Sequence, residues 1–165
     1  MNALVVYDSV FGNTERVAHA IGEALGDQVE VETCRVAEVR PEQLVGLAFL
    51  IVGSPTRGFK PTPAITNFLK RLPRNSLAGV RVAAFDTRFS EREIEASARI
   101  LPFLVGIFGY AAEPISDRLE KRGGERIAPP EGFIVSGTEG PMAEGELDRA
   151  ADWARQILTQ SALVQ

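Results

Sequence analysis

Cysteine is nearly absent from this 165-residue sequence, since Cys34 is the only one. A lone cysteine excludes a disulfide framework and a metal site built from cysteines alone. No apolar run approaches the ~20 residues that a membrane-spanning helix needs. The first residues lack the basic flank, long apolar stretch and cleavage site of a secretory signal. These absences predict a soluble, cytoplasmic protein.

An excess of positive charge is also missing. The chain holds 18 Lys and Arg against 22 Asp and Glu, for a formal net charge of −4. Domains that bind nucleic acid usually carry a basic patch and a high pI, so we expect no nucleic-acid partner. A chain of this length can bury roughly 70% of its unfolded surface without disulfides or metals. We therefore expect residues 1–165 to form a single domain.

Short apolar runs alternate with helical patterns along the chain. Runs with the length and composition of strands occur at 3–7, 29–33, 47–52, 80–85 and 133–135. Apolar residues at helical spacing predict helices over 14–25, 63–72, 114–122 and 147–158. Alternation of this kind is typical of right-handed βαβ units, which build a mainly parallel sheet with helices on both faces.

The connection between the fourth and fifth predicted strands is longer than one helix requires. Nearly 50 residues lie there, and we expect an apolar insertion around 90–112. Its most apolar part, 100–110, is interrupted by Pro102, Gly106 and Gly109. Three roles remain open for this part: a helix that closes the core, a lid or homodimer patch, or a shallow contact with a membrane or quinone.

The loop after the first strand favours a phosphate. It consists of Ser9, Val10, Phe11, Gly12, Asn13 and Thr14. Free backbone N–H groups, hydroxyls and the positive end of the following helix attract anions. The sequence has neither Gly-x4-Gly-Lys-Ser/Thr nor Gly-x-Gly-x-x-Gly here, which argues against a nucleoside triphosphate or dinucleotide site. The alternative is an ordinary helix start capped by Asn13 or Thr14.

Two further loops follow the third and fourth predicted strands, at the edge of the sheet where ligands of such folds bind. The second loop contains Ser54, Pro55, Thr56, Arg57, Gly58 and Phe59. The third opens with Asp86, Thr87, Arg88 and Phe89. The second loop could instead be a solvated turn, and Asp86 and Arg88 could simply pair with each other. Residues 137–141 could touch a ligand, although a structural turn is the better interpretation.

The first loop resembles the phosphate loop of flavodoxins and of the wider flavodoxin-like FMN proteins. Their pattern is Ser/Thr-x-Thr-Gly-x-Thr, which Ser9, Gly12 and Thr14 match, whereas Phe11 replaces the middle hydroxyl. The alternating pattern extends the resemblance over nearly the whole chain. It implies a doubly wound five-stranded sheet of order 2-1-3-4-5, FMN as the cofactor, and the residues of the three loops as its binding site.

The resemblance also implies that the second and third loops flank the flavin ring. Gly58 would let a peptide rotate to meet flavin N5, and Phe59 is the available aromatic ring. Arg57 near the pyrimidine edge would stabilise an anionic reduced flavin and raise its potential. Many flavodoxins stack a Tyr after the fourth strand; Phe89 or Tyr110 would substitute for it here.

Electron transfer to a redox partner protein, or to a small acceptor such as a quinone, is the implied function. It needs no catalytic side chain, because the flavin performs the chemistry. Small carriers of the family are more acidic than this chain, so an NAD(P)H- or quinone-linked flavin oxidoreductase is an alternative, with a protoporphyrinogen-oxidising enzyme more distant. A flavin-free binding module on the same fold is a further alternative. A phosphoacceptor receiver domain is excluded, because this chain has neither the second acidic residue beside Asp8 nor the Lys after Val135 that such domains need.

Overall fold

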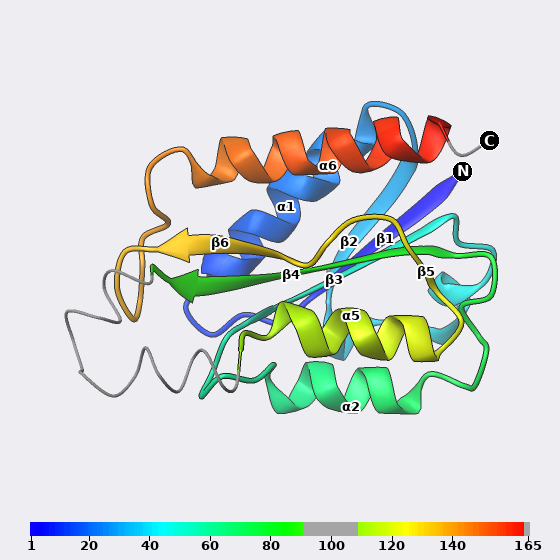
Figure 1. The fold of residues 1–165 in the computed structure, drawn as a ribbon, viewed down its shortest axis with the longest axis horizontal. Coiled ribbons are helices and arrows are strands. Elements are labelled where there is room, and N and C mark those ends of the chain that lie inside the picture. Colours follow the sequence, from blue (N-terminus) through cyan, green and yellow to red (C-terminus); the bar gives the residue numbers. More distant parts are fainter. Residues whose placement is uncertain (91–108, 164–165) are drawn as a thin grey trace.

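The computed structural model describes residues 1–90 and 109–163, and its centre is a parallel sheet (Figure 1). The first four strands are β1 (Asn2–Tyr7), β2 (Glu30–Arg35), β3 (Phe49–Pro55) and β4 (Arg81–Phe89). Two short strands, β5 (Glu125–Arg126) and β6 (Glu131–Val135), both pair with β4 and share the fifth position. The expected order 2-1-3-4-5 is confirmed, with the last strand divided in two.

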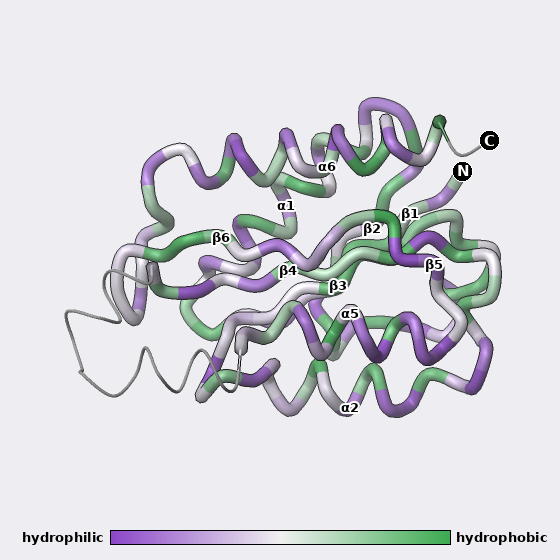
Figure 2. Tube along the Cα trace, viewed as in Figure 1, coloured by the Kyte–Doolittle hydropathy of each residue, from purple (hydrophilic) through white to green (hydrophobic). Residues whose placement is uncertain are grey.

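Helices cover both faces of the sheet (Figure 1). One face is covered by α1 (Asn13–Gly26) and α6 (Glu146–Leu163), the other by α2 (Pro63–Arg71) and α5 (Ala112–Lys121). Two short 3-10 helices, η1 (Val36–Glu38) and η2 (Pro41–Leu44), connect β2 to β3. Each helix buries one apolar stripe, as Val17, Ile21 and Leu25 do in α1. Figure 2 shows the corresponding alternation of hydrophobic and hydrophilic stretches along the helices.

The third and fourth strands run further than their apolar residues suggest. The β3–β4 ladder continues through Ser54–Asp86 and Pro55–Thr87, and β6 pairs with β4 as far as Phe89–Val135. The prediction that a loop opens at Asp86 is therefore wrong, because backbone pairing on both sides keeps residues 86–89 in the strand. Strand β5 consists of two charged, exposed residues, so no apolar run in the sequence predicts it.

Three aromatic rings fill the core between β4, β6 and α6. Phe85, Phe133 and Trp153 contact one another edge to face, with centroids 6.0–6.3 Å apart. Gly53 on β3 makes room for Phe85, since a Cβ there would lie 2.0 Å from the ring. This packing fixes β3 against β4 directly before the ends that carry candidate site residues.

Most of the expected insertion, residues 91–108, lies outside the described residues, and so do the roles considered for 100–108. The chain re-enters the described part at Gly109. No helix within 1–90 or 109–163 is both long enough and apolar enough to cross a membrane.

Truncation of Phe133 tests the aromatic core. Phe133→Ala should lower the free energy of unfolding by roughly 3–5 kcal/mol, because a fully buried ring leaves a cavity. Urea denaturation followed by circular dichroism measures the loss. Val45→Ala is the control: its side chain is 77% exposed, and its effect should stay within about 0.5 kcal/mol. Equal effects of the two substitutions would contradict this account of the core.

Candidate functional site

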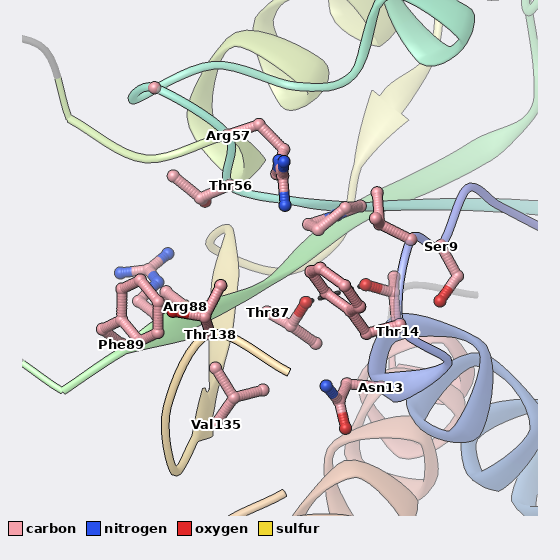
Figure 3. A pocket seen from close by; sticks show the side chains of 14 residues that line it. Ser9, Asn13, Thr14, Thr56, Arg57, Thr87, Arg88, Phe89, Val135 and Thr138 are labelled. Atoms are coloured by element: carbon pink, nitrogen blue, oxygen red, sulfur yellow. Dashed lines mark hydrogen bonds between the residues drawn. The ribbon is translucent and has the colours of Figure 1, made fainter. Parts of the chain in front are cut away.

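The carboxyl ends of β1, β3, β4 and β6 enclose a pocket of about 320 Å³ (Figure 3). Most of its lining comes from the three predicted loops and strand ends. These lining residues are Ser9, Val10, Phe11, Asn13, Thr14, Pro55, Thr56, Arg57, Gly58, Thr87, Arg88 and Phe89. Val135 and Thr138 complete the wall. Gly12, Ser54, Phe59 and Asp86 were also predicted, but they do not line the pocket.

Helix α1 begins at the pocket without a side-chain cap. Gly12 occupies the N-cap position with a left-handed φ of 92°, and it has no side chain that could cap the first turn of α1. The alternative of a cap by Asn13 or Thr14 is therefore wrong. Instead the Gly12 N–H donates to Ser9 Oγ over 3.0 Å, which folds the loop back on itself. An uncapped first turn leaves backbone donors and the positive helix end for an anion.

A hydroxyl pair joins α1 to the sheet at the base of the pocket. Thr14 Oγ1 and Thr87 Oγ1 lie 2.7 Å apart, and both residues are buried (Figure 3). Each hydroxyl can donate one hydrogen bond, and only one of the two protons is needed between them. The second proton is therefore available to a group in the pocket.

Arg35 supports the first loop from outside the pocket. Its guanidinium donates to the Ser9 carbonyl over 3.0 Å and to Glu15 Oε2 over 3.2 Å, and it lies 3.5 Å from Asp8 Oδ1. Glu15 also accepts from the Tyr7 hydroxyl over 3.1 Å. Burial, with a smaller contribution from Glu15, raises the pKa of Tyr7. The positive charge of Arg35 is thus compensated by neighbouring carboxylates.

The second loop is a tight hairpin that carries Arg57 over the pocket. Paired backbone bonds of 2.8 and 3.1 Å join Arg57 to Lys60, and both intervening residues have positive φ, 54° at Gly58 and 67° at Phe59. Figure 3 shows the Arg57 side chain directed into the pocket, and its Cζ lies 5.7 Å from the centre of the Phe11 ring. Phe59 lines a separate hollow with Pro63 and Pro114.

Thr138 lines the pocket and belongs to the turn 137–141, for which a structural role was the preferred interpretation. Asn13 Nδ2 donates to the Glu139 carbonyl over 3.1 Å, which ties the turn to α1. Gly140 packs so closely that a Cβ there would lie 2.5 Å from Asn13 Oδ1. No local signal reveals this contact, because its partners are 126 residues apart.

Comparison with known proteins fits this architecture. The family model described as a flavodoxin domain matches residues 4–125. This chain belongs to the flavodoxin domain family.

One relative is an uncharacterized protein from Methanocaldococcus jannaschii, 35% identical over 72 residues. The match covers 41% of this chain and 18% of that protein, so the chain spans much less than two thirds of that relative.

Several solved structures share the fold. An archaeal flavodoxin has a TM-score of 0.73 at 21% identity, over 97% of this chain and 98% of that one. Oxidised Flavodoxin 2 from Bacillus cereus has a TM-score of 0.74 at 22% identity, over 97% and 99%. The rubredoxin oxygen:oxidoreductase of Desulfovibrio gigas has a TM-score of 0.70 at 17% identity, but only 37% of that longer chain is covered.

The charged side chains that line the pocket are positive, although the chain is negative overall. Arg57 and Arg88 are the charged side chains among its lining residues, and no carboxylate lines it. Arg88 pairs with the buried Asp86 beneath it, which is the local pairing considered above. Arg57 forms no ion pair within the described residues. Val10, Phe11 and Phe89 expose apolar surface at the rim. Such a pocket suits an anionic ligand with a flat apolar part.

Removal of the Thr14 hydroxyl tests the hydroxyl pair. Thr14→Val keeps the shape but leaves the buried Thr87 Oγ1 without this partner, which should cost about 1–3 kcal/mol of unfolding free energy in the ligand-free protein. Thr87→Val should cost a similar amount, and the double variant less than the sum. Urea denaturation gives all three values.

The control for this cycle is Thr159→Val on the exposed side of α6, where the change should stay within about 0.5 kcal/mol. Additive effects of Thr14→Val and Thr87→Val would show that the two hydroxyls do not interact.

Proposed function

We propose that this protein binds FMN in the pocket and passes electrons between that cofactor and a redox partner protein or a small acceptor such as a quinone. The observation that carries the proposal is the uncapped start of α1 beside a carboxylate-free pocket that holds two arginines. The phosphate and the ring system of FMN need these two features side by side.

The first loop has the donors that a phosphate requires. Ser9 Oγ accepts the Gly12 N–H, so its own proton is free to donate. The Thr14–Thr87 pair has a second spare proton, and the first turn of α1 adds backbone N–H groups. A phosphate there would be bound by neutral donors and the helix dipole, because no Lys or Arg belongs to this loop.

The ends of β3 and β4 offer surfaces for the flavin ring. Pro55, Thr56 and Gly58 lie on one wall, and Thr87 and Phe89 on another. Bound flavin stores and releases one or two electrons, which is the chemistry that such a site acquires from its cofactor. The protein's own contribution is binding, orientation and charge, and no acid, base or nucleophile from the chain is required.

Exposed apolar residues at the rim support delivery of electrons through this edge. Val10, Phe11 and Phe89 are 51%, 45% and 37% exposed, so an apolar acceptor or a protein face can pack against them. A homodimer through residues 100–110 and a single domain with an insertion at 90–112 remain part of the proposal. So does a cytoplasmic location, which the free Cys34 supports.

Titration with FMN tests the central claim. Added protein should quench FMN fluorescence with one site per chain, measured in phosphate-free buffer so that free phosphate does not compete. Riboflavin should bind at least about tenfold more weakly, since each hydrogen bond to a charged phosphate contributes roughly 1.5–3 kcal/mol. Absence of FMN binding would refute the proposal in favour of a flavin-free module, and equal affinity for riboflavin would refute the phosphate site.

Charge reversal at Arg57 tests the redox role of the hairpin. Arg57→Glu should lower the midpoint potential of bound FMN, because a positive charge near the ring favours the anionic reduced form. Lys60→Glu is a matched control: it changes the net charge equally on the same hairpin, but Lys60 does not line the pocket. Spectroelectrochemical titration measures both. An equal shift in the two variants would remove the specific role of Arg57.

A further inference from the structure

Asp86 is a fully buried carboxylate that precedes the pocket-lining residues Thr87 and Arg88 on β4. It lies in the middle of the sheet, where its register partners are Ser54 on β3 and Gly132 on β6. Both of its oxygens accept from Arg88: Nε donates to Oδ1 and Nη2 to Oδ2, each over 2.6 Å. Burial raises the pKa of Asp86, and these bonds act against that rise. The short, two-pronged geometry is that of an ion pair.

The surrounding chain holds this ion pair in one position. The Ala112 N–H at the start of α5 donates to Asp86 Oδ2 over 2.9 Å. The ring of Tyr110 covers the Arg88 guanidinium, with Cζ 3.6 Å from the ring centre. Gly132 leaves the space that the guanidinium fills, because a Cβ there would lie 2.1 Å from Arg88 Nε. Two segments, residues 110–112 and strand β6, thus hold the Asp86–Arg88 pair in place.

The two arginines of the pocket therefore differ in character. Arg88 is immobilised, its charge is balanced by Asp86, and its Nη1 group donates to no acceptor among residues 1–90 and 109–163. Arg57 lies on an exposed hairpin with no balancing carboxylate in the same ranges. A balanced cation gives a directed hydrogen bond with little net field, whereas an unbalanced one gives a field.

We infer that Asp86 is a positioning residue: it fixes Arg88 as a hydrogen-bond donor to the bound flavin and cancels the charge of Arg88, so that Arg57 alone sets the net charge of the pocket. This inference rests on the proposed binding of FMN and specifies how the site treats the oxidised and reduced forms. Arg88 stabilises both forms equally, and Arg57 favours the anionic reduced form.

Asp86→Asn tests the charge balance. The amide keeps the size and one acceptor, but it leaves Arg88 uncompensated, so the pocket gains one positive charge. The ratio of the affinity for reduced FMN to that for oxidised FMN should rise about three- to tenfold, as expected for one partly screened charge near the ring. Anaerobic titrations with oxidised and with reduced FMN give this ratio. An unchanged or lower ratio would overturn the inference.

Arg88→Lys tests the hydrogen bond and does not depend on the folding of the Asp86 variant. Arg88 is a fifth exposed, so lysine fits, and its ammonium still balances Asp86 but has no second prong for the flavin. Both affinities should fall at least about threefold, as for the loss of one hydrogen bond, with their ratio unchanged. Unchanged affinities, or a shifted ratio, would overturn the inference.

Asp152→Asn is the matched control, since it makes the same change beside Arg155 on exposed α6. Neither affinity nor the ratio should change, and a ratio raised as much as in Asp86→Asn would overturn the inference. The outcome also separates the two proposals. If the unaltered protein binds no FMN, both fail. If it binds FMN, but Asp86→Asn leaves the affinity ratio unchanged and Arg88→Lys leaves both affinities unchanged, only the inference fails.

Discussion

Parallel pairing on both sides of β3 is the constraint on which the rest of the molecule depends. Because β1, β3 and β4 all run in one direction, three chain exits are delivered to the same edge of the sheet. Strand β3 is buried on both faces, and Gly53 within it admits the Phe85 ring, so β3 and β4 are locked in register. The pocket lies where the chain leaves the ends of these strands, and the pairing of the strands fixes the positions of its walls.

Periodicity and local motifs carry enough information to predict most of the fold. The helices and the parallel strands follow from apolar spacing, and Ser9, Gly12 and Thr14 beside the first strand carry the family resemblance that the flavodoxin-domain match confirms. Elements whose position depends on backbone pairing with distant segments could not be predicted from the sequence. Residues 86–89 read as a loop because Asp86 and Arg88 are charged, yet pairing with β6 keeps them in β4. No local sequence pattern predicts the positions of Thr138 and β5, because contacts with remote segments fix them.

Burial explains how charged residues can occupy such positions. A carboxylate in the middle of a sheet is strongly unfavourable alone, and Asp86 is tolerated because Arg88 and the Ala112 N–H satisfy it. Arg35 is balanced in a similar way by Asp8 and Glu15 on the outside of the first loop. Compensation of this kind leaves local fields weak around most of the pocket, and the overall charge of −4 therefore says little about the field that a ligand meets.

The contact between Arg57 and Phe11 connects the hairpin to the first loop across the entrance of the pocket. A ligand ring that inserts between Arg57 and Phe11 would have to break this contact. An exposed cation–π contact stabilises by about 0.5–1 kcal/mol, so its loss would weaken observed binding by roughly two- to fivefold. This cost is the same for every ligand that inserts between Arg57 and Phe11, so it lowers affinity without discriminating between ligands.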